Sequence, residues 1–389
     1  MITPKQIEEW IKEARERPSS GPVLIQFIGQ RLKFLADRNE ELLAENIQLR
    51  SGSKVEELES RIASLENQLE LLKRQFGGEL PELLAPSLSL LCFNTSGKLL
   101  RVEIPLDGLE HGTRLAQFDE PLNPADPSTT LLVTSPLEEL LLMFETGRTA
   151  SIAVASVPAA DAGVVRWNSA LQTETRGGEE LCGILPVASL PLFDHCIQVS
   201  RRGFAKRIGR SYLQGYIARD YIGGGTRQKL DRPFGLFFIN ENDLAVIASR
   251  EGSVLTLPLT GLPYNAEETI RFPVTDYVIN AFNPLDRAHI VMVTQDGKVV
   301  QREASWLTPS TSLKTRGQQL IPPGRLSSGT RAAAILPCNE SDWGVALAAS
   351  GTLTLYRMAD LFSAGSLPGA EADPVVDFKS FSLPSVDRK

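Results

Sequence analysis

The chain has 389 residues, 42% of them hydrophobic, and 40 Lys and Arg stand against 47 Asp and Glu, a formal net charge of −7. That length exceeds one ordinary core, so two or more domains are expected. The four cysteines, scattered without a CxxC pair, argue against a disulfide scaffold or a zinc site and suit the cytoplasm. A charged N-terminus without an apolar core argues against a signal peptide, and the lack of any run of 18 apolar residues argues against a membrane span.

Residues 1–20 are predicted to hold a short helix, which Pro18 ends. Residues 21–78 carry a heptad pattern typical of a coiled coil, and its frame shifts by two residues at Ser51-Gly52-Ser53. The predicted seam consists of Ile25, Ile28, Leu32, Leu35, Asn39, Leu42, Asn46 and Leu49 before this break, and Val55, Leu58, Ile62, Leu65, Leu69, Leu72 and Phe76 after it.

The partner of this helix is predicted to be a second copy of the chain. A lone amphipathic helix cannot bury its own seam, and the sequence offers no second helix of matching length. Asn39 and Asn46 favour a parallel homodimer, because each buried amide is best satisfied by the same Asn of the other helix. A trimer and an intramolecular hairpin folded at Gly52 remain the alternatives.

Residues 79–87 are predicted as a linker, 88–370 as an all-β domain and 371–389 as a C-terminal tail. Six windows within the β region share one pattern of an apolar strand, a polar turn that ends in Gly, and a second strand. The predicted turn glycines are Gly97, Gly147, Gly203, Gly252, Gly297 and Gly351, at spacings of 50, 56, 49, 45 and 54 residues. Glycine suits a tight hairpin because such turns require a positive φ.

This repeat predicts an N-terminal coiled coil followed by an all-β, six-bladed, propeller-like disc. A period near 50 residues with about four strands per unit is typical of a blade array. Closing the array removes the open sheet edges that favour aggregation. An irregular β-sandwich with recurring hairpins is the alternative, and six matches to one pattern weigh against it.

The β region resembles the C-terminal domain of the DNA gyrase A subunit and of the related topoisomerase IV subunit. The resemblance covers about residues 88–365 and is clearest in QVSRRGFAKRI of the third unit, followed by ARDYIGGGTRQKL. VTQDGKVVQRE and LKTRGQQL repeat it in the fifth unit. The resemblance implies a six-bladed β-pinwheel whose rim binds and bends DNA.

The chain departs from that family in two respects. The gyrase-specific box, a Gln followed by basic residues interleaved with glycines, has no intact copy here; residues 223–227 hold a fragment of it. The resemblance therefore supports the pinwheel better than it supports gyrase-like wrapping of DNA. The topoisomerase cleavage module is also absent, because the coiled coil stands in its place.

The sequence predicts a protein without catalytic activity. It contains no P-loop, HExxH helix or GxSxG elbow, and its three histidines lie far apart. His195 and His289 occupy corresponding positions before two of the hairpins, which indicates a repeated structural role. No cofactor and no metal ion are expected.

Basic residues gather in residues 196–230, where eight of them face a single acidic residue, Asp220, for a net charge of +7. Residues 79–389 as a whole carry −6, so without this segment they would carry −13. Dense like charge is better explained by phosphate binding than by stability. The predicted DNA-binding residues are Arg201, Arg202, Lys206, Arg207, Arg210, Arg219, Arg227 and Lys229, with a lesser contact at Lys298, Arg302, Lys314 and Arg316.

Together these features predict a dimeric protein that binds and bends duplex DNA without sequence preference, in the cytoplasm and associated with the nucleoid. Topoisomerases or other chromosome proteins are conceivable partners, and a membrane is not. The alternative function is a coiled-coil and propeller scaffold that binds proteins on its faces and does not touch DNA. Composition alone does not separate the two.

Overall fold

The computed structural model places residues 87–125, 128–160, 163–173, 175–176, 178–188, 190–217, 220–222, 231, 233–285 and 287–383, together with residues 11–12, 22, 25–26 and 28–29. The chain divides into two compact units, Met1–Leu83 and Leu84–Lys389. In the first unit the described residues are helical, among them Ile25 and Ile28 of the predicted seam. All other predicted seam residues, from Leu32 to Phe76, lie outside the described residues.

Six antiparallel hairpins are the repeating element of the second unit. Their first strands are β1 (Ser87–Asn94), β5 (Glu139–Phe144), β10 (His195–Ser200), β13 (Leu244–Ser249), β17 (His289–Thr294) and β21 (Trp343–Ala348). Their second strands are β2 (Lys98–Pro105), β6 (Thr149–Ala153), β11 (Phe204–Gly209), β14 (Ser253–Pro258), β18 (Val299–Glu303) and β22 (Thr352–Arg357). We number blades 1 to 6 in this order.

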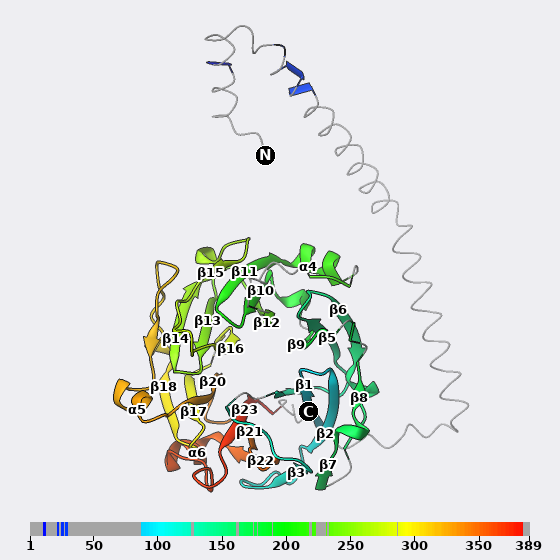
Figure 1. Ribbon diagram of the computed structural model, residues 1–389, viewed down its shortest axis with the longest axis vertical. Coiled ribbons are helices and arrows are strands. Elements are labelled where there is room, and N and C mark those ends of the chain that lie inside the picture. Colours follow the sequence, from blue (N-terminus) through cyan, green and yellow to red (C-terminus); the bar gives the residue numbers. More distant parts are fainter. Residues whose placement is uncertain are drawn as a thin grey trace, which may run out of the picture. The chain divides into compact units, whose positions relative to one another are not determined.

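Each hairpin gains an inner strand from the same unit of sequence, and these strands surround the centre of the ring (Figure 1). The inner strands are β4 (Thr129–Thr134), β9 (Leu181–Pro186), β12 (Pro233–Ile239), β16 (Val278–Phe282), β20 (Ala332–Cys338) and β23 (Val375–Phe381). β23 completes blade 6 by pairing with β21, so the predicted tail boundary at residue 371 is wrong and the domain continues through residue 381.

The outer edge of each blade is covered by the next unit of sequence. β8 (Leu171–Gln172), β15 (Glu267–Glu268) and β19 (Gln318–Gln319) cover blades 1, 3 and 4, and single bridges at Tyr221 and Ser366 cover blades 2 and 5. β3 (Arg114–Phe118) follows the hairpin of blade 1 in the sequence. It pairs with β22 of blade 6 and so closes the ring. β7 (Gly163–Val165) runs parallel to β3 on the outside.

Short helices complete the domain between the strands. The α-helices are α4 (Arg210–Ile217), α5 (Pro323–Ser327) and α6 (Met358–Ala364). The 3-10 helices are Val154–Ser156, Trp167–Ser169, Leu190–Leu192, Leu259–Gly261 and Ala304–Trp306. No helix among the described residues is long and apolar enough to cross a membrane.

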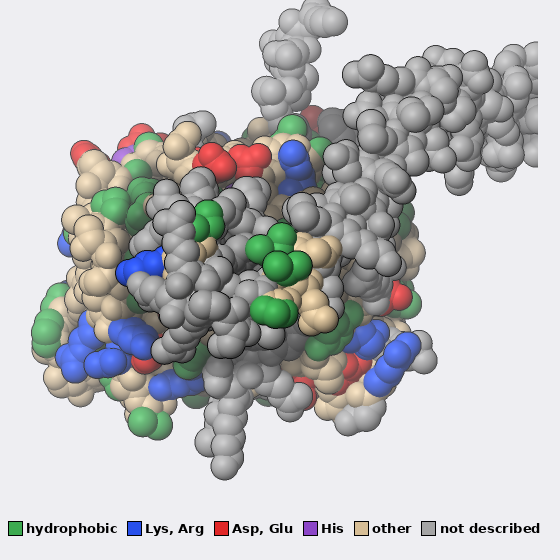
Figure 2. Space-filling model, turned by 90° about the horizontal axis from the view of Figure 1, so that it is seen from above, with side chains coloured by type: hydrophobic (Ala, Val, Ile, Leu, Met, Phe, Trp, Pro, Cys, Tyr) green, Lys and Arg blue, Asp and Glu red, His purple; other side chains and the backbone are tan. Residues whose placement is uncertain are grey.

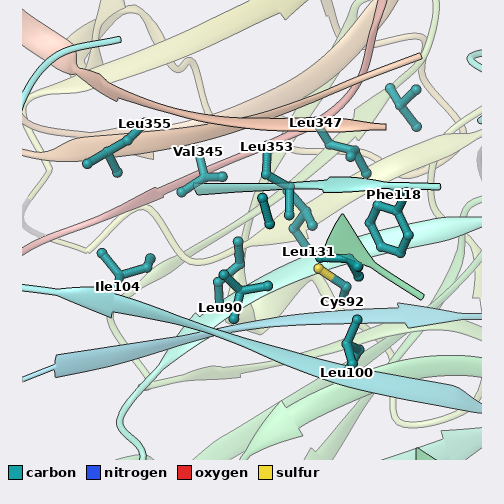
Figure 3. Close-up of a cluster of buried hydrophobic side chains, with 14 of the residues drawn as sticks. Leu90, Cys92, Leu100, Ile104, Phe118, Leu131, Val345, Leu347, Leu353 and Leu355 are labelled. Carbon is teal, nitrogen blue, oxygen red and sulfur yellow. The ribbon is translucent and has the colours of Figure 1, made fainter. Parts of the chain in front are cut away.

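The hydrophobic core lies between neighbouring blades and is divided into separate clusters. At the closure, Leu90, Cys92 and Leu100 of blade 1 pack against Val345 and Leu353 of blade 6 (Figure 3). Comparable buried clusters fill the other five interfaces. Because a blade is covered on both sides, the first strand of its hairpin is apolar at consecutive positions instead of alternating, as in β5 and β13.

The turn glycines have two structural roles. All six lie at positive φ, between 79° and 88°. In every blade the carbonyl of the turn glycine also accepts a backbone N–H from the outer segment contributed by the next unit, as from Thr269 to Gly203 at 2.9 Å. A Cβ on Gly203 would collide with the side chain of Ile270 in that segment. Glycine therefore allows both the turn and the close approach of the outer segment.

Buried or half-buried carboxylates cap several of these turns. Asp231, Asp276 and Asp373 each accept the backbone N–H of the second turn residue of their blade, at 3.0, 3.0 and 2.8 Å. In blade 2, Glu179 accepts the Thr146 hydroxyl at 2.6 Å and pairs with Arg148. Part of the acidic excess of this domain therefore stabilises the turns.

Candidate nucleic-acid interface

The turn of blade 3 contains Arg201 and Arg202, and both guanidinium groups contact the protein itself. Arg202 donates to the carbonyls of Pro273 and Val274, each at 3.2 Å, and to that of Asp276. Arg201 lies over the ring of Tyr277, with 4.3 Å between its Cζ and the ring centroid. Both residues thus hold the segment that leads from the rim into the inner strand of blade 4.

Lys206 and Arg207 occupy consecutive positions of β11 and therefore point to opposite faces of the blade. Arg207 stacks on the exposed ring of Tyr264, with its Cζ 3.9 Å from the centroid. Lys206 is half-buried, and burial lowers the pKa of its ammonium group.

Arg210 lies at the far end of the same hairpin, where it donates to the Pro191 carbonyl at 2.6 Å. Six-residue strands span about 20 Å, so the turn arginines and Arg210 lie near opposite faces of the disc. The five clustered basic residues of the sequence therefore do not share one surface.

A different basic cluster forms on the rim between blades 3 and 4. Ile270 and Thr315 form a parallel β-bridge. Two backbone hydrogen bonds reinforce it: the N–H of Arg271 donates to the Thr315 carbonyl at 2.9 Å, and the N–H of Lys314 donates to the Thr269 carbonyl at 2.7 Å. The Ile270 side chain points inward, so its exposed neighbours along the bridge lie on the outer side. These neighbours are Arg271, Lys314 and Arg316.

One further exposed arginine, Arg325 of α5, lies on the segment that wraps the turn of blade 4. We call Arg271, Lys314, Arg316 and Arg325 the basic arc. Glu268, 3.9 Å from the Arg271 Nε, forms the one ion pair with these four side chains among the described residues. Figure 2 shows Lys and Arg side chains gathering toward the lower left of the face seen there.

The arc coincides only in part with the residues predicted from the sequence. Lys314 and Arg316 were predicted as a lesser contact and belong to it. Lys298 pairs with Asp296 at 3.6 Å on blade 5, and Arg302 lies on β18 of the same blade. Arg219, Arg227 and Lys229 lie outside the described residues.

Sequence reasoning missed Arg271 and Arg325. Arg271 follows two glutamates, which cancel its charge in any window of sequence. Its position in the repeat identifies it: Arg271 stands two residues after Thr269, whose N–H donates to the carbonyl of the turn glycine Gly203. At the equivalent position of blade 6, two residues after Phe118, stands Glu120. Equivalent rim sites on opposite sides of the ring therefore carry opposite charge.

A cavity of about 440 Å³ occupies the centre of the ring and is lined by the inner strands. Its charged lining groups already have partners within the protein, as Lys379 has in Asp377 at 3.9 Å. Burial raises the pKa of Asp377, and hydrogen bonds from the backbone N–H groups of Leu131 and Phe378 oppose that shift. Within the described part of the chain, no three His, Cys, Asp or Glu residues are placed to hold a metal ion.

Comparison with known proteins supports the fold. No family model matches the chain, and no curated protein matches it. A structure of the DNA gyrase A C-terminal domain aligns with a TM-score of 0.54 and 10% identity, over 76% of this chain and 99% of that one. The C-terminal domain of DNA topoisomerase IV aligns with a TM-score of 0.47 and 14% identity, over 77% of this chain and 95% of that one. The E. coli ParC C-terminal domain aligns with a TM-score of 0.43 and 13% identity, over 63% of this chain and 99% of that one.

The alignment with the DNA gyrase A C-terminal domain, at a TM-score of 0.54, confirms the resemblance to this type of domain at the level of the fold. The six-bladed, propeller-like β arrangement expected from the sequence is present. At 10% identity the likeness extends to the fold alone, and the surface residues carry any argument about function.

Proposed function

We propose that this protein binds the phosphate backbone of duplex DNA, without sequence preference, through the basic arc. The observation that carries the proposal is the arc itself: four exposed basic side chains on one stretch of the rim, in a chain of net charge −7. That the domain aligned at a TM-score of 0.54 belongs to DNA gyrase adds support.

The expected mode of binding follows from the kind of groups present. Arg and Lys on a rim contact phosphates, and each neutralised phosphate releases counterions. No long helix projects from the described rim to enter the major groove, so direct reading of base edges is not expected. At the equivalent site of blade 6 a glutamate, Glu120, takes the place of Arg271, so the arc does not recur on the opposite side of the ring, which favours local bending or bridging over a full wrap.

The role we propose is non-catalytic, with a coiled coil over residues 21–78 that joins two copies. The alternative is a protein-binding scaffold, and one observation favours it. Leu137, Leu192 and Tyr212, which are 93%, 75% and 70% exposed, lie on blades 2 and 3 at the end away from the hairpin turns.

The deciding experiment compares two triple variants by fluorescence anisotropy on a duplex of about 30 base pairs, between about 50 and 200 mM salt. Arg271, Lys314 and Arg316 are changed to Ala in one variant. In the matched control, Arg114, Arg166 and Arg357, which are exposed near blades 6 and 1, are changed to Ala.

The arc variant should flatten the slope of log affinity against log salt by roughly 0.9 for each phosphate that it no longer neutralises, whereas the control keeps the wild-type slope. Unrelated duplex sequences should be affected alike. Wild-type protein that does not bind DNA at low salt, or equal reductions of affinity in both variants, would overturn the proposal and leave the scaffold in its place.

A further inference from the structure

The segment after Arg271 forms a tight turn with an apolar tip. The backbone N–H of Asp276 donates to the Pro273 carbonyl at 3.2 Å, which closes a β-turn with Val274 and Thr275 at its corner. Val274 is 93% exposed. Corners of such turns usually carry Gly, Pro, Asn, Asp or Ser, so the exposed valine departs from the usual choice.

The turn is held rigidly from two blades. The Arg202 guanidinium, from the hairpin of blade 3, donates to three of its carbonyls. From blade 4, the backbone N–H of Glu251 donates to Asp276 Oδ1 at 3.0 Å, and the Thr275 hydroxyl donates to Glu251 Oε1 at 3.1 Å. The apolar tip is therefore presented to solvent in a fixed conformation.

The tip also lies beside the basic arc. Val274 is three residues after Arg271, and the Ile270–Thr315 bridge brings Lys314 and Arg316 to the base of the same segment. A duplex whose phosphates contact these residues would pass close to Pro273 and Val274.

We infer that Pro273 and Val274 form a wedge that enters the minor groove of the bound duplex and opens a base step, bending the DNA. Architectural proteins bend DNA by inserting apolar side chains, proline among them, between base steps beside Arg and Lys contacts. This inference rests on the proposed DNA binding. It assigns Arg202 a positioning role, because its guanidinium holds the wedge.

The test measures bending and affinity separately. End-to-end FRET on a duplex of about 30 base pairs reports the bend, and anisotropy on the same duplex reports Kd. Val274→Ser should remove most of the FRET change and raise Kd about three- to tenfold, with an unchanged salt slope, because the substitution removes apolar surface and leaves every phosphate-binding side chain in place. A duplex already bent by a short bulge should restore most of the affinity.

The matched control is Leu137→Ser, since Leu137 is equally exposed, at 93%, and lies away from the hairpin turns. It should leave bend and Kd unchanged. Arg202→Lys, which keeps the charge and removes the planar fork, should reduce the bend without changing the salt slope.

Three outcomes separate the two proposals. Wild-type protein that does not bind DNA contradicts the proposed function. Binding without a bend, or a bend that survives Val274→Ser, overturns the wedge and leaves the arc intact. Equal effects of Val274→Ser and Leu137→Ser also overturn the wedge.

Discussion

At the scale of single residues, Lys314 contributes a charge to the basic arc but has a backbone conformation that is unfavourable for lysine. Its φ of 61° is left-handed, a conformation that costs a residue with a side chain about 1–3 kcal/mol. The strain is maintained by the hydrogen bond from its N–H to Thr269 and by the Ile270–Thr315 bridge that follows. Glycine would be favoured here on conformational grounds alone, so the lysine is retained at some expense in stability.

Lys314→Gly should therefore have opposite effects on stability and on DNA binding. Relief of the left-handed strain, partly offset by the greater freedom of glycine in the unfolded chain, should stabilise the fold by up to about 1 kcal/mol. Removal of one phosphate-binding side chain should weaken DNA binding and reduce the salt slope by about 0.9. Urea denaturation and anisotropy measure the two effects; a variant that is less stable than the wild type would contradict the strain argument.

Gly203 presents the reverse case. Its backbone conformation disfavours any residue with a side chain, and its surroundings leave no room for one. Its φ is 81°, and a Cβ would collide with Ile270 and lie 2.9 Å from Cε2 of Phe272. Gly203→Ala should cost more than the roughly 1–3 kcal/mol of left-handed backbone strain alone. Gly215→Ala is the control, since that residue lies within α4 with nothing near its Cβ position, and it should be neutral or stabilise by up to about 1 kcal/mol. Equal denaturation midpoints for the two variants would contradict this account.

At the scale of elements, the sequence predicts the hairpins well because each is a local pattern. Strand, glycine turn and strand lie within fifteen residues, as in LAVIASREGSVLTLP. The outer strands that each blade receives from the next repeat are not visible in the same way, because several consist of two residues and pair across 62 to 74 positions, as β11 pairs with β15 and β2 with β8. No local periodicity records such a partner.

The same distinction explains the candidate site. Residues 201–210 are a dense run of charge along the chain, but the alternation of β11 and the length of the hairpin distribute them over different faces. The arc is assembled from segments about 45 residues apart, which the Ile270–Thr315 bridge and the backbone hydrogen bonds beside it bring together. Likewise, each capping aspartate precedes an inner strand, and nothing in the sequence distinguishes it from an acidic residue of an ordinary loop.

The closure of the ring depends on β3, and Phe118 is the residue that anchors it. Phe118 is 2% exposed, packs on Trp167 at 5.0 Å between ring centroids, and donates its N–H to the Gly351 carbonyl at 2.9 Å. Phe118→Ala should cost about 3–5 kcal/mol. Leu115→Ala, at a partly buried position of the same strand, should cost clearly less. Comparable reductions of the unfolding free energy in urea would show that β3 does not act through this anchor.

At the scale of the whole molecule, the β domain is charged unevenly around its ring. Arg271, Lys314, Arg316 and Arg325 lie on the rim at blades 3 and 4, whereas at the equivalent site of blade 6 stands Glu120, beside Asp119, which pairs with Arg166 at 3.4 Å. A single domain of this kind offers one short contact to a duplex. Two linked domains would offer two, and the second binding event would then occur at the high effective concentration that a linker provides.

The predicted coiled coil would supply that link, and this prediction can be tested without altering the β domain. Sedimentation of the full chain should give about twice the chain mass of 42.6 kDa. Leu35→Glu with Leu65→Glu places charges in the predicted seam and should yield a monomer with an unchanged urea transition of the β domain. On a long duplex this monomer should bind more weakly than the wild type, whereas on a duplex long enough for only one arc the two should bind alike. A full-length protein that is monomeric at micromolar concentration contradicts the dimer, and a seam variant that remains dimeric shows that the contact lies elsewhere.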